Sequence, residues 1–174
     1  NMFGDVPLVL TTDYRKNMGA NRSGTDEVYG RIAADLRSAM ELLAKDYAHA
    51  AGERTRINYY AAAALLARTC LYRGDWKEAE SLATEVIGQD GLYGLEADLD
   101  RVFVKNSREA IWQLKTLGQT SETWEAFAML NFSATSPPPY TLVPDLLEVF
   151  AEDDERRKRW IGSITVDGKE HYYP

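Results

Sequence analysis

The segment from Arg56 to Ile87, RINYYAAAALLARTCLYRGDWKEAESLATEVI, constrains the fold most strongly because its pattern changes halfway along. Residues 58–73 are apolar on most sides when they are placed on a helix, and such a helix has to pack between neighbours. One of its apolar stripes consists of Tyr59, Ala63, Leu66 and Cys70. Residues 76–87 place apolar side chains on one face and charged ones on the other, which is typical of a half-exposed helix. The segment therefore predicts two packed helices, with the first one sandwiched.

The short joint between these helices predicts an antiparallel pair. Gly74 is placed to end the first helix, and Asp75 is placed to cap the second one, three residues before Glu78. Gly88 follows the last apolar residue of the second helix and predicts its end.

This pair fits the tetratricopeptide pattern at its small and apolar positions. The matching residues are Leu66, Ala67, Cys70, Ala79 and Ala83. Ala63 and Gly91 stand where the pattern has Trp and Pro, so those two positions fail. Small residues at a helix crossing let two backbones approach closely, so we interpret residues 58–88 as a tetratricopeptide-like hairpin, with an unrelated helical hairpin as the alternative.

The remainder of the chain predicts a mainly α fold with long irregular loops and minor short strands. A helix is expected over residues 25–45, with Thr25 as its N-cap. Residues 89–141 form an irregular segment whose short apolar runs fit either strands or single helical turns. Further along the chain, a short helix is expected over residues 143–151 and a hairpin-like end over residues 160–174, turning at Asp167 and Gly168.

Composition excludes several classes of protein. The net charge of −7 argues against binding to a nucleic-acid backbone. A single cysteine permits neither an internal disulfide nor a thiolate metal site. No apolar run approaches the roughly 20 residues of a membrane helix. His49 and His171 lack metal-ligand spacing, and no phosphate-binding loop or nucleophile elbow is present, so we expect no catalytic residues, no metal site and no cofactor.

The acidic residues do not predict a site either. Glu152 to Glu155 are followed at once by Arg156 to Arg159, which is more typical of a self-paired surface than of a glycosidase active site. Glu96, Asp98 and Asp100 alternate like calcium ligands, but the glycine and the distant glutamate of a calcium loop are missing.

Six stretches, in this order, resemble the SusD/RagB family of Bacteroidetes outer-membrane nutrient-binding lipoproteins. They are FGDVPLVL from Phe3, DEVYGRIAADLRSAMELL from Asp26, ALLARTCLYRGDWKEAESLATEVI from Ala64, YGLEADLDRVF from Tyr93, REAIWQLK from Arg108 and LVPDLLEVFAEDDER from Leu142. The last stretch carries the family's F-x3-D-x-R signature as Phe150, Asp154 and Arg156. The resemblance covers essentially the whole chain, although it matches the middle portion of the family's proteins.

The resemblance implies a non-catalytic, surface-exposed protein that takes part in polysaccharide utilisation. Such a protein binds an oligosaccharide and acts as a lid on a SusC-like TonB-dependent transporter on the cell-surface face of the outer membrane. Some relatives take peptides instead of glycans. The family's lipidated N-terminal cysteine and its first and last helices are absent from this chain, so the membrane anchor is inferred from the family alone.

The aromatic residues suggest where a ligand binds. Trp124, Phe132 and Tyr140 lie in a long polar segment without clear periodicity, and loops of such length are often functional. Aromatic faces beside hydroxyl and amide groups suit a sugar ring, so these three residues are the predicted ligand-binding set, with Trp124 first. The alternative is that the rings only pin the loop to the body of the protein. We expect Tyr72, Trp76 and Trp112, by contrast, to lie in the core.

Two other functions stay open on the sequence. A tetratricopeptide scaffold that binds a peptide would need about three stacked repeats, whereas the chain shows one good hairpin and one weaker helix before it. An enzyme related to helical glycosidases would have to hydrolyse a glycan.

Overall fold

The computed structural model describes residues 3–115, 124–133 and 135–174 and divides the chain into two compact units. The first unit comprises residues 1–94 and 110–112, and the second comprises residues 95–109 and 113–174. Each unit is described by itself. The assignment of the whole chain to one domain stays a prediction.

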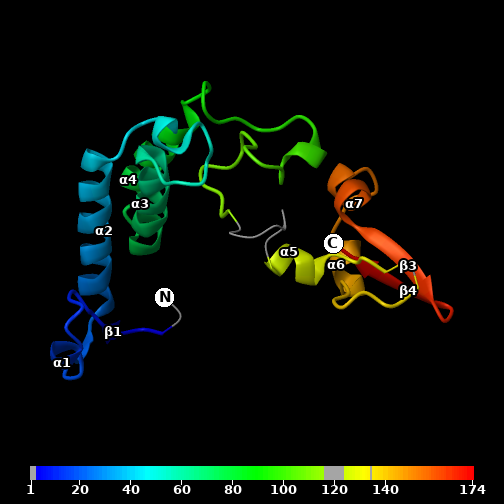
Figure 1. Ribbon diagram of the computed structural model, residues 1–174, viewed down its shortest axis with the longest axis horizontal. Helices are drawn as coiled ribbons and strands as arrows, with labels where there is room; N and C mark the ends of the chain where they lie inside the picture. Colours follow the sequence, from blue (N-terminus) through cyan, green and yellow to red (C-terminus); the bar gives the residue numbers. More distant parts are fainter. Residues whose placement is uncertain (1–2, 116–123, 134) are drawn as a thin grey trace. The chain divides into compact units, whose positions relative to one another are not determined.

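Three helices form the body of the first unit (Figure 1). They are α2 (Thr25–Leu42), α3 (Tyr59–Arg73) and α4 (Trp76–Ile87). Helix α3 packs against both of the others, as predicted from the apolar residues on most of its sides. Its buried residues are Tyr60, Ala62, Ala63, Leu66, Ala67, Thr69 and Cys70. The mainly helical fold class with a tetratricopeptide-like hairpin is confirmed.

The turn between α3 and α4 depends on a left-handed glycine. Gly74 adopts φ +80°, and the N–H of Asp75 donates to the carbonyl of Cys70 at 2.9 Å, which closes the end of α3. Asp75 occupies the N-cap position of α4, but its side chain makes no capping hydrogen bond. The carboxylate lies 3.4 Å from Nε of Arg73 instead. The prediction of a capping side chain at Asp75 is therefore wrong, while the predicted end at Gly74 is correct.

Helix α2 begins one residue away from the expected cap and ends earlier than expected. Gly24 is the N-cap and Thr25 is the first helical residue. The N–H of Thr25 donates to the carboxylate of Asp5 at 3.3 Å, so the acid that caps this helix comes from a distant part of the chain. The helix ends at Leu42 rather than at residue 45, because Leu43 adopts an extended backbone.

Three aromatic residues that the sequence places in the core lie outside it. Tyr72 is 56% exposed, Trp76 64% and Trp112 49%. All three predictions are wrong. On α3 and α4, the small residues Ala63, Ala67 and Ala79 fill the contact between the helices, and Tyr72 and Trp76 lie at exposed positions. Trp112 lies outside the helices, and its Nε1 donates to the carbonyl of Thr55 at 3.3 Å.

The core of the first unit contains a buried polar group, which is unusual for so small a helix bundle. Arg54 is 7% exposed and donates to the carbonyls of Leu92 at 2.5 Å and Ala110 at 2.7 Å. Its guanidinium carbon lies 5.1 Å from the ring centroid of Tyr47 and 5.2 Å from that of Tyr93. The contact satisfies two backbone acceptors and holds the segments that carry them against the helices.

Two tyrosines and an asparagine complete this core. The hydroxyls of Tyr47 and Tyr93 lie 2.7 Å apart, and Nδ2 of Asn58 donates to the Tyr93 hydroxyl at 3.0 Å. Asn58 also caps α3, because its Oδ1 accepts from the N–H of Ala61 at 3.0 Å. Burial raises the pKa of Tyr47 well above its ordinary value, so its hydroxyl stays protonated and donates to the carbonyl of Ile111.

Short elements flank these helices. The first unit also contains α1 (Tyr14–Asn17), η1 (Ala48–Ala50) and an antiparallel pair of two-residue strands, β1 (Val6–Pro7) and β2 (Arg22–Ser23). Among the residues that the structure describes, no helix has both the length and the apolar character needed to cross a bilayer.

The second unit contains short helices and a β-hairpin. Its elements are η2 (Leu99–Arg101), α5 (Trp124–Met129), α6 (Pro144–Glu148), α7 (Glu155–Trp160), β3 (Gly162–Val166) and β4 (Lys169–Tyr173). Pro144 occupies the first turn of α6, which is shorter than the expected 143–151. Helix α5 lies inside the segment that the sequence leaves irregular.

The hairpin turns at the expected dipeptide. Asp167 has φ 51° and Gly168 has φ 77°, and two successive positive φ values are the signature of a type I′ turn. Gly162 lies opposite Tyr173 in the ladder. A Cβ at Gly162 would stand 2.6 Å from the Tyr173 ring, so the tyrosine covers the glycine across the strands.

We expect Gly162→Ala to destabilise this hairpin by about 1 kcal/mol, because the added methyl group forces the Tyr173 side chain off its preferred rotamer. Urea unfolding of the variant measures this change. Ser163→Ala, at the exposed neighbouring position, is the control and should leave the midpoint nearly unchanged. Equal midpoints for Gly162→Ala and the parent would contradict the packing of Tyr173 over the glycine.

Candidate ligand-binding site

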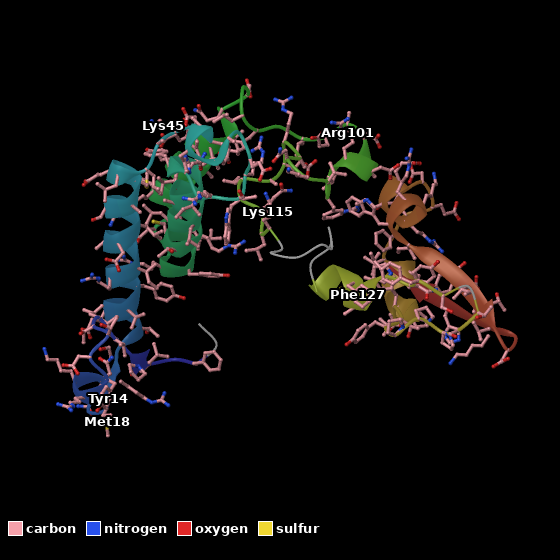
Figure 2. All side chains as sticks on the ribbon, in the orientation of Figure 1. Tyr14, Met18, Lys45, Arg101, Lys115 and Phe127 are labelled. Atoms are coloured by element: carbon pink, nitrogen blue, oxygen red, sulfur yellow. The ribbon has the colours of Figure 1, made fainter. Side chains whose placement is uncertain are left out.

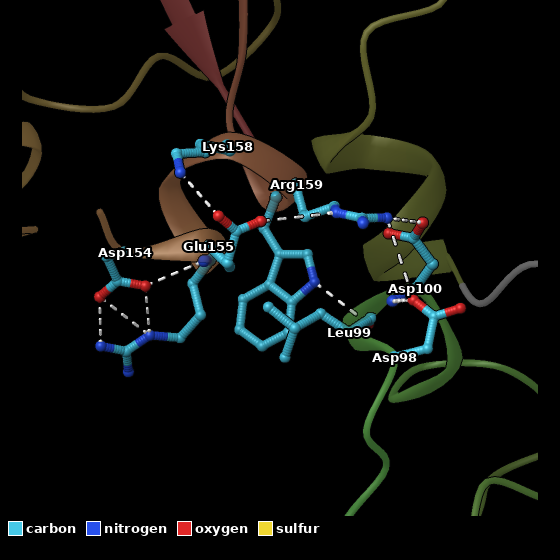
Figure 3. A network of polar contacts seen from close by, with 9 residues as sticks. Asp98, Leu99, Asp100, Asp154, Glu155, Lys158 and Arg159 are labelled. Atoms are coloured by element: carbon cyan, nitrogen blue, oxygen red, sulfur yellow. Dashed lines mark hydrogen bonds and ion pairs between the residues drawn. The ribbon is translucent and has the colours of Figure 1, made fainter. Parts of the chain in front are cut away.

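The acidic and basic run at residues 152–159 forms pairs with itself, as the sequence indicates. Asp154 is the N-cap of α7 and accepts from the N–H of Arg156 at 2.9 Å. The Arg156 guanidinium also donates to both carboxylate oxygens of Asp154, at 2.6 Å for its closest contact. Nζ of Lys158 lies 2.6 Å from Glu155 (Figure 3). These carboxylates stabilise a helix end on an exposed surface, which leaves them poorly suited to acid–base chemistry.

The same helix contacts η2 through one arginine and one tryptophan. Arg159 lies 2.6 Å from the carboxylate of Asp100, and Nε1 of Trp160 donates to the carbonyl of Leu99 at 3.3 Å (Figure 3). Asp98 caps η2 by accepting from the N–H of Asp100 at 3.1 Å. The alternating acids therefore serve as a cap and an ion-pair partner. Within the described residues, no group of His, Cys, Asp or Glu side chains is arranged to hold a metal ion.

The Asp154 cap should make stability depend on pH. Arg156 lowers the pKa of Asp154 below its ordinary value of 3.8, so the unfolded chain binds the proton more tightly than the folded one. The stabilising contribution is complete above the ordinary value and is lost as pH falls through the lower, folded-state pKa.

We expect Asp154→Asn to reduce the loss of stability between about pH 5 and about pH 2, because asparagine still caps a helix but carries no charge. Urea midpoints of the parent and the variant at both pH values measure this difference. Asp153→Asn, at an exposed neighbouring position, is the matched control. A parent and an Asp154→Asn variant with the same pH dependence would show that the carboxylate contributes nothing as a charge.

An apolar hollow lies in the second unit, between α5 and the proline-rich loop that follows it. Its volume is about 520 Å³, which is within the range of small-molecule pockets. The described lining residues are Phe127, Ala128, Leu130, Asn131, Phe132, Ser133, Pro137, Pro139 and Tyr140. Phe127 projects from α5, as Figure 2 shows, and its ring stacks on that of Phe132 with centroids 5.3 Å apart and planes at 30°.

Local chemistry shapes the loop around this hollow. Oδ1 of Asn131 accepts from the N–H of Ser133 at 3.1 Å, and Oγ of Ser133 accepts from the N–H of Ser136 at 2.9 Å. Such side-chain contacts to the backbone make tight turns. The three prolines at 137–139 then restrict the chain, because each ring fixes φ, and Pro138 is buried. The turns and the prolines together return the chain from Phe132 to Tyr140.

The structure brings two of the three predicted ligand-binding residues together. Phe132 is 66% exposed and Tyr140 is 61% exposed, and both line the hollow. Neither ring is buried in a core, and their role in ligand binding stays a prediction. Trp124 begins α5, but its side chain lies outside the described residues, so its role stays a prediction.

Sequence reasoning missed Phe127 and Leu130. They belong to the run Ala126-Phe127-Ala128-Met129-Leu130, which is the longest apolar stretch within residues 115–141. That run was the available signal for a short helix within a segment interpreted as irregular.

A second, smaller hollow lies in the first unit beside the N-terminal half of α2. Its volume is about 230 Å³. Phe3, Val6, Val28, Tyr29 and Ile32 are among its lining residues. This hollow has less than half the volume of the one beside α5, and Thr25 and Tyr29 supply the polar side chains among its described lining residues, so it suits a ligand less well.

Comparison with known proteins finds similarity to one family. Residues 1–71 match the SusD-like family described as starch-binding and associating with the outer membrane. A SusD superfamily protein from Bacteroides thetaiotaomicron is similar at 27% identity and a TM-score of 0.55, over 63% of this chain and 24% of that protein. The chain is thus similar to the SusD-like family over residues 1–71 and to SusD-like solved structures over a larger part of its length. The resemblance in the sequence is thereby confirmed.

Two further solved structures share the SusD fold over most of the chain. A SusD-like carbohydrate-binding protein from Bacteroides vulgatus has a TM-score of 0.68 at 21% identity, over 94% of this chain and 35% of its own. A SusD superfamily protein from the same species has a TM-score of 0.63 at 22% identity, over 88% of this chain and 35% of its own. The chain thus spans about a third of the length of these SusD-like proteins. No curated protein matches it.

Proposed function

We propose that this SusD-like chain belongs to a non-catalytic protein that captures an oligosaccharide at the cell-surface face of the outer membrane. The protein then passes its ligand to a SusC-like TonB-dependent transporter. The observation that carries the proposal is the hollow beside α5, where the exposed rings of Phe127, Phe132 and Tyr140 lie together.

The chemistry of this hollow suits a sugar. Pyranose rings have apolar C–H faces that stack on aromatic rings, while their hydroxyl edges need hydrogen-bonding partners. The stacked pair of Phe127 and Phe132 supplies an aromatic surface, and Asn131, Ser133 and Tyr140 supply polar atoms. Trp124 is proposed as a further ring of the same platform, since it begins the helix that carries Phe127.

Binding without hydrolysis is the favoured mode. A glycosidase needs two carboxyl groups on either side of the scissile bond, and none of the described lining residues is acidic. The carboxylates of Asp154 and Glu155 are held by Arg156 and Lys158. We therefore expect the protein to bind a glycan and to leave it intact.

The membrane location and the transporter partner are inferred from the family. The matched family is described as associating with the outer membrane, and one similar structure is that of a carbohydrate-binding protein. Attachment to the membrane would be through an N-terminal lipid anchor. A tetratricopeptide scaffold for peptides is less favoured, because the described residues contain one such hairpin and a stable array needs about three repeats.

Titration of the full chain with a panel of starch, xylan, mannan and galactan oligosaccharides tests the proposal. We expect Phe132→Ala to weaken the affinity for the bound glycan by roughly 1–3 kcal/mol, the typical effect of removing one stacking ring. The melting temperature should change little, because this ring is largely exposed.

Phe103→Ala is the matched control, since Phe103 is an exposed phenylalanine of the same unit and does not line the hollow. Its affinity for the glycan should equal that of the parent. Binding of peptides alone, hydrolysis of the glycan, or an affinity that Phe132→Ala leaves unchanged would overturn the proposed function or its site.

A further inference from the structure

The described side chains that line the hollow beside α5 carry no formal charge. Three of them have polar atoms, namely Asn131, Ser133 and Tyr140, and the others are aliphatic or aromatic. The chain as a whole carries a net charge of −7. The uncharged lining and the negative net charge both influence which class of glycan the hollow can accept.

An anionic sugar would lose part of its hydration in this hollow without gaining a cation from the lining residues that the structure describes. Carboxylate and sulfate groups are costly to desolvate unless an Arg or Lys pairs with them, and Arg forms the strongest such pairs. The negative net charge adds a long-range repulsion against polyanions. A neutral sugar has neither a charge to desolvate nor a repulsion to overcome.

The polar atoms of the hollow fit neutral hydroxyl groups. Oδ1 of Asn131 and Oγ of Ser133 already accept from backbone N–H groups of the loop, at 3.1 Å and 2.9 Å for their closest contacts. The amide hydrogens of Asn131 and the hydroxyl hydrogen of Ser133 are thereby left as donors for the ring and hydroxyl oxygens of a sugar. Neutral donors of this kind do not replace the hydration shell of a full negative charge.

We propose that the hollow lined by Phe127, Phe132 and Tyr140 selects neutral oligosaccharides and discriminates against those that carry carboxylate or sulfate groups. This inference rests on the proposed function, and it names the class of glycan that the same site takes.

The test compares each neutral polysaccharide with a charged derivative of the same backbone. Starch is paired with carboxymethyl starch, and the xylan, mannan and galactan of the panel are each paired with their carboxymethyl derivatives. We expect the full chain to bind the charged member at least about tenfold more weakly than the neutral one, because none of the described lining residues offsets the desolvated charge. Its affinity for the neutral member should be nearly independent of salt concentration.

A pair of variants separates the local charge of the hollow from the net charge of the protein. Leu130 lines the hollow, whereas the adjacent, half-exposed Met129 does not. Leu130→Lys is expected to recover about tenfold in affinity for the carboxymethyl polymer relative to the neutral one. Met129→Lys adds the same charge to the protein and should leave the ratio of the two affinities unchanged.

The outcomes distinguish this inference from the proposed function. Equal or tighter binding of the carboxymethyl polymer by the parent would overturn the inference and leave glycan binding intact. An identical shift for Leu130→Lys and Met129→Lys would also overturn it, because net charge alone would then set the preference. Failure to bind any polymer of either charge would overturn both proposals.

Discussion

Replacement of Arg54 by methionine should destabilise the first unit by about 2–4 kcal/mol, the largest effect we expect from any single substitution in this chain. Methionine retains much of the length of the side chain but cannot donate to the carbonyls of Leu92 and Ala110. Burial of these acceptors without a partner carries their desolvation cost, and the contacts of the guanidinium with Tyr47 and Tyr93 are lost as well.

Arg56→Met is the matched control, because Arg56 is an exposed arginine only two residues after Arg54, in the segment before α3. Urea unfolding of both variants measures the difference in the free energy of unfolding. If Arg54→Met and Arg56→Met lost the same small amount, the buried guanidinium would have no special part in holding residues 92 and 110 to the helices.

Enlargement of Ala67 to leucine should cost roughly 1–3 kcal/mol, because Ala67 occupies the small position of the tetratricopeptide pattern on α3. Ala67 is 9% exposed and lies in one buried cluster with Ala79 and Leu82 of α4. Three extra carbon atoms at this crossing would have to push the two helices apart or force side chains off their rotamers.

The same substitution at an exposed position provides the control. Ala34 lies on the exposed side of α2, so Ala34→Leu adds the same atoms without crowding a neighbour. Thermal unfolding should show a clear drop for Ala67→Leu and almost none for Ala34→Leu. Equal melting temperatures for Ala67→Leu and the parent would refute the close packing of α3 on α4.

The two units differ in how much of each the sequence could predict. The hairpin of α3 and α4 follows from local signals. Helical periodicity specifies the two helices, and Gly74 specifies the turn between them. The turn at Asp167 and Gly168 is equally local. Helix α5 was missed because six residues carry too little periodicity to stand out from a polar segment.

The candidate site was predictable in its residue types rather than in its shape. Phe132 and Tyr140 stand out because they are aromatic rings in a long polar segment without periodicity, and both line the hollow. Phe127 joins them because its ring stacks on that of Phe132, five residues further along the chain. A spacing of five matches neither the helix nor the strand periodicity. The turns at Asn131 and Ser133 that bring the rings together depend on hydrogen bonds that form only in the folded loop.

The sequence by itself determined the helical class, the hairpin and the resemblance to SusD-like proteins, because these depend on periodicity, on turn residues and on the order of motifs along the chain. The tertiary structure decided which residues are buried. Tyr72 and Trp76 have apolar spacing and lie exposed, while Arg54 is charged and lies buried. Burial depends on partners that are distant in sequence: Arg54 is held by carbonyls of residues 92 and 110, and the carboxylate that caps α2 belongs to Asp5. No local pattern encodes such pairings, because each one forms only after folding has brought together two residues that are distant in the sequence.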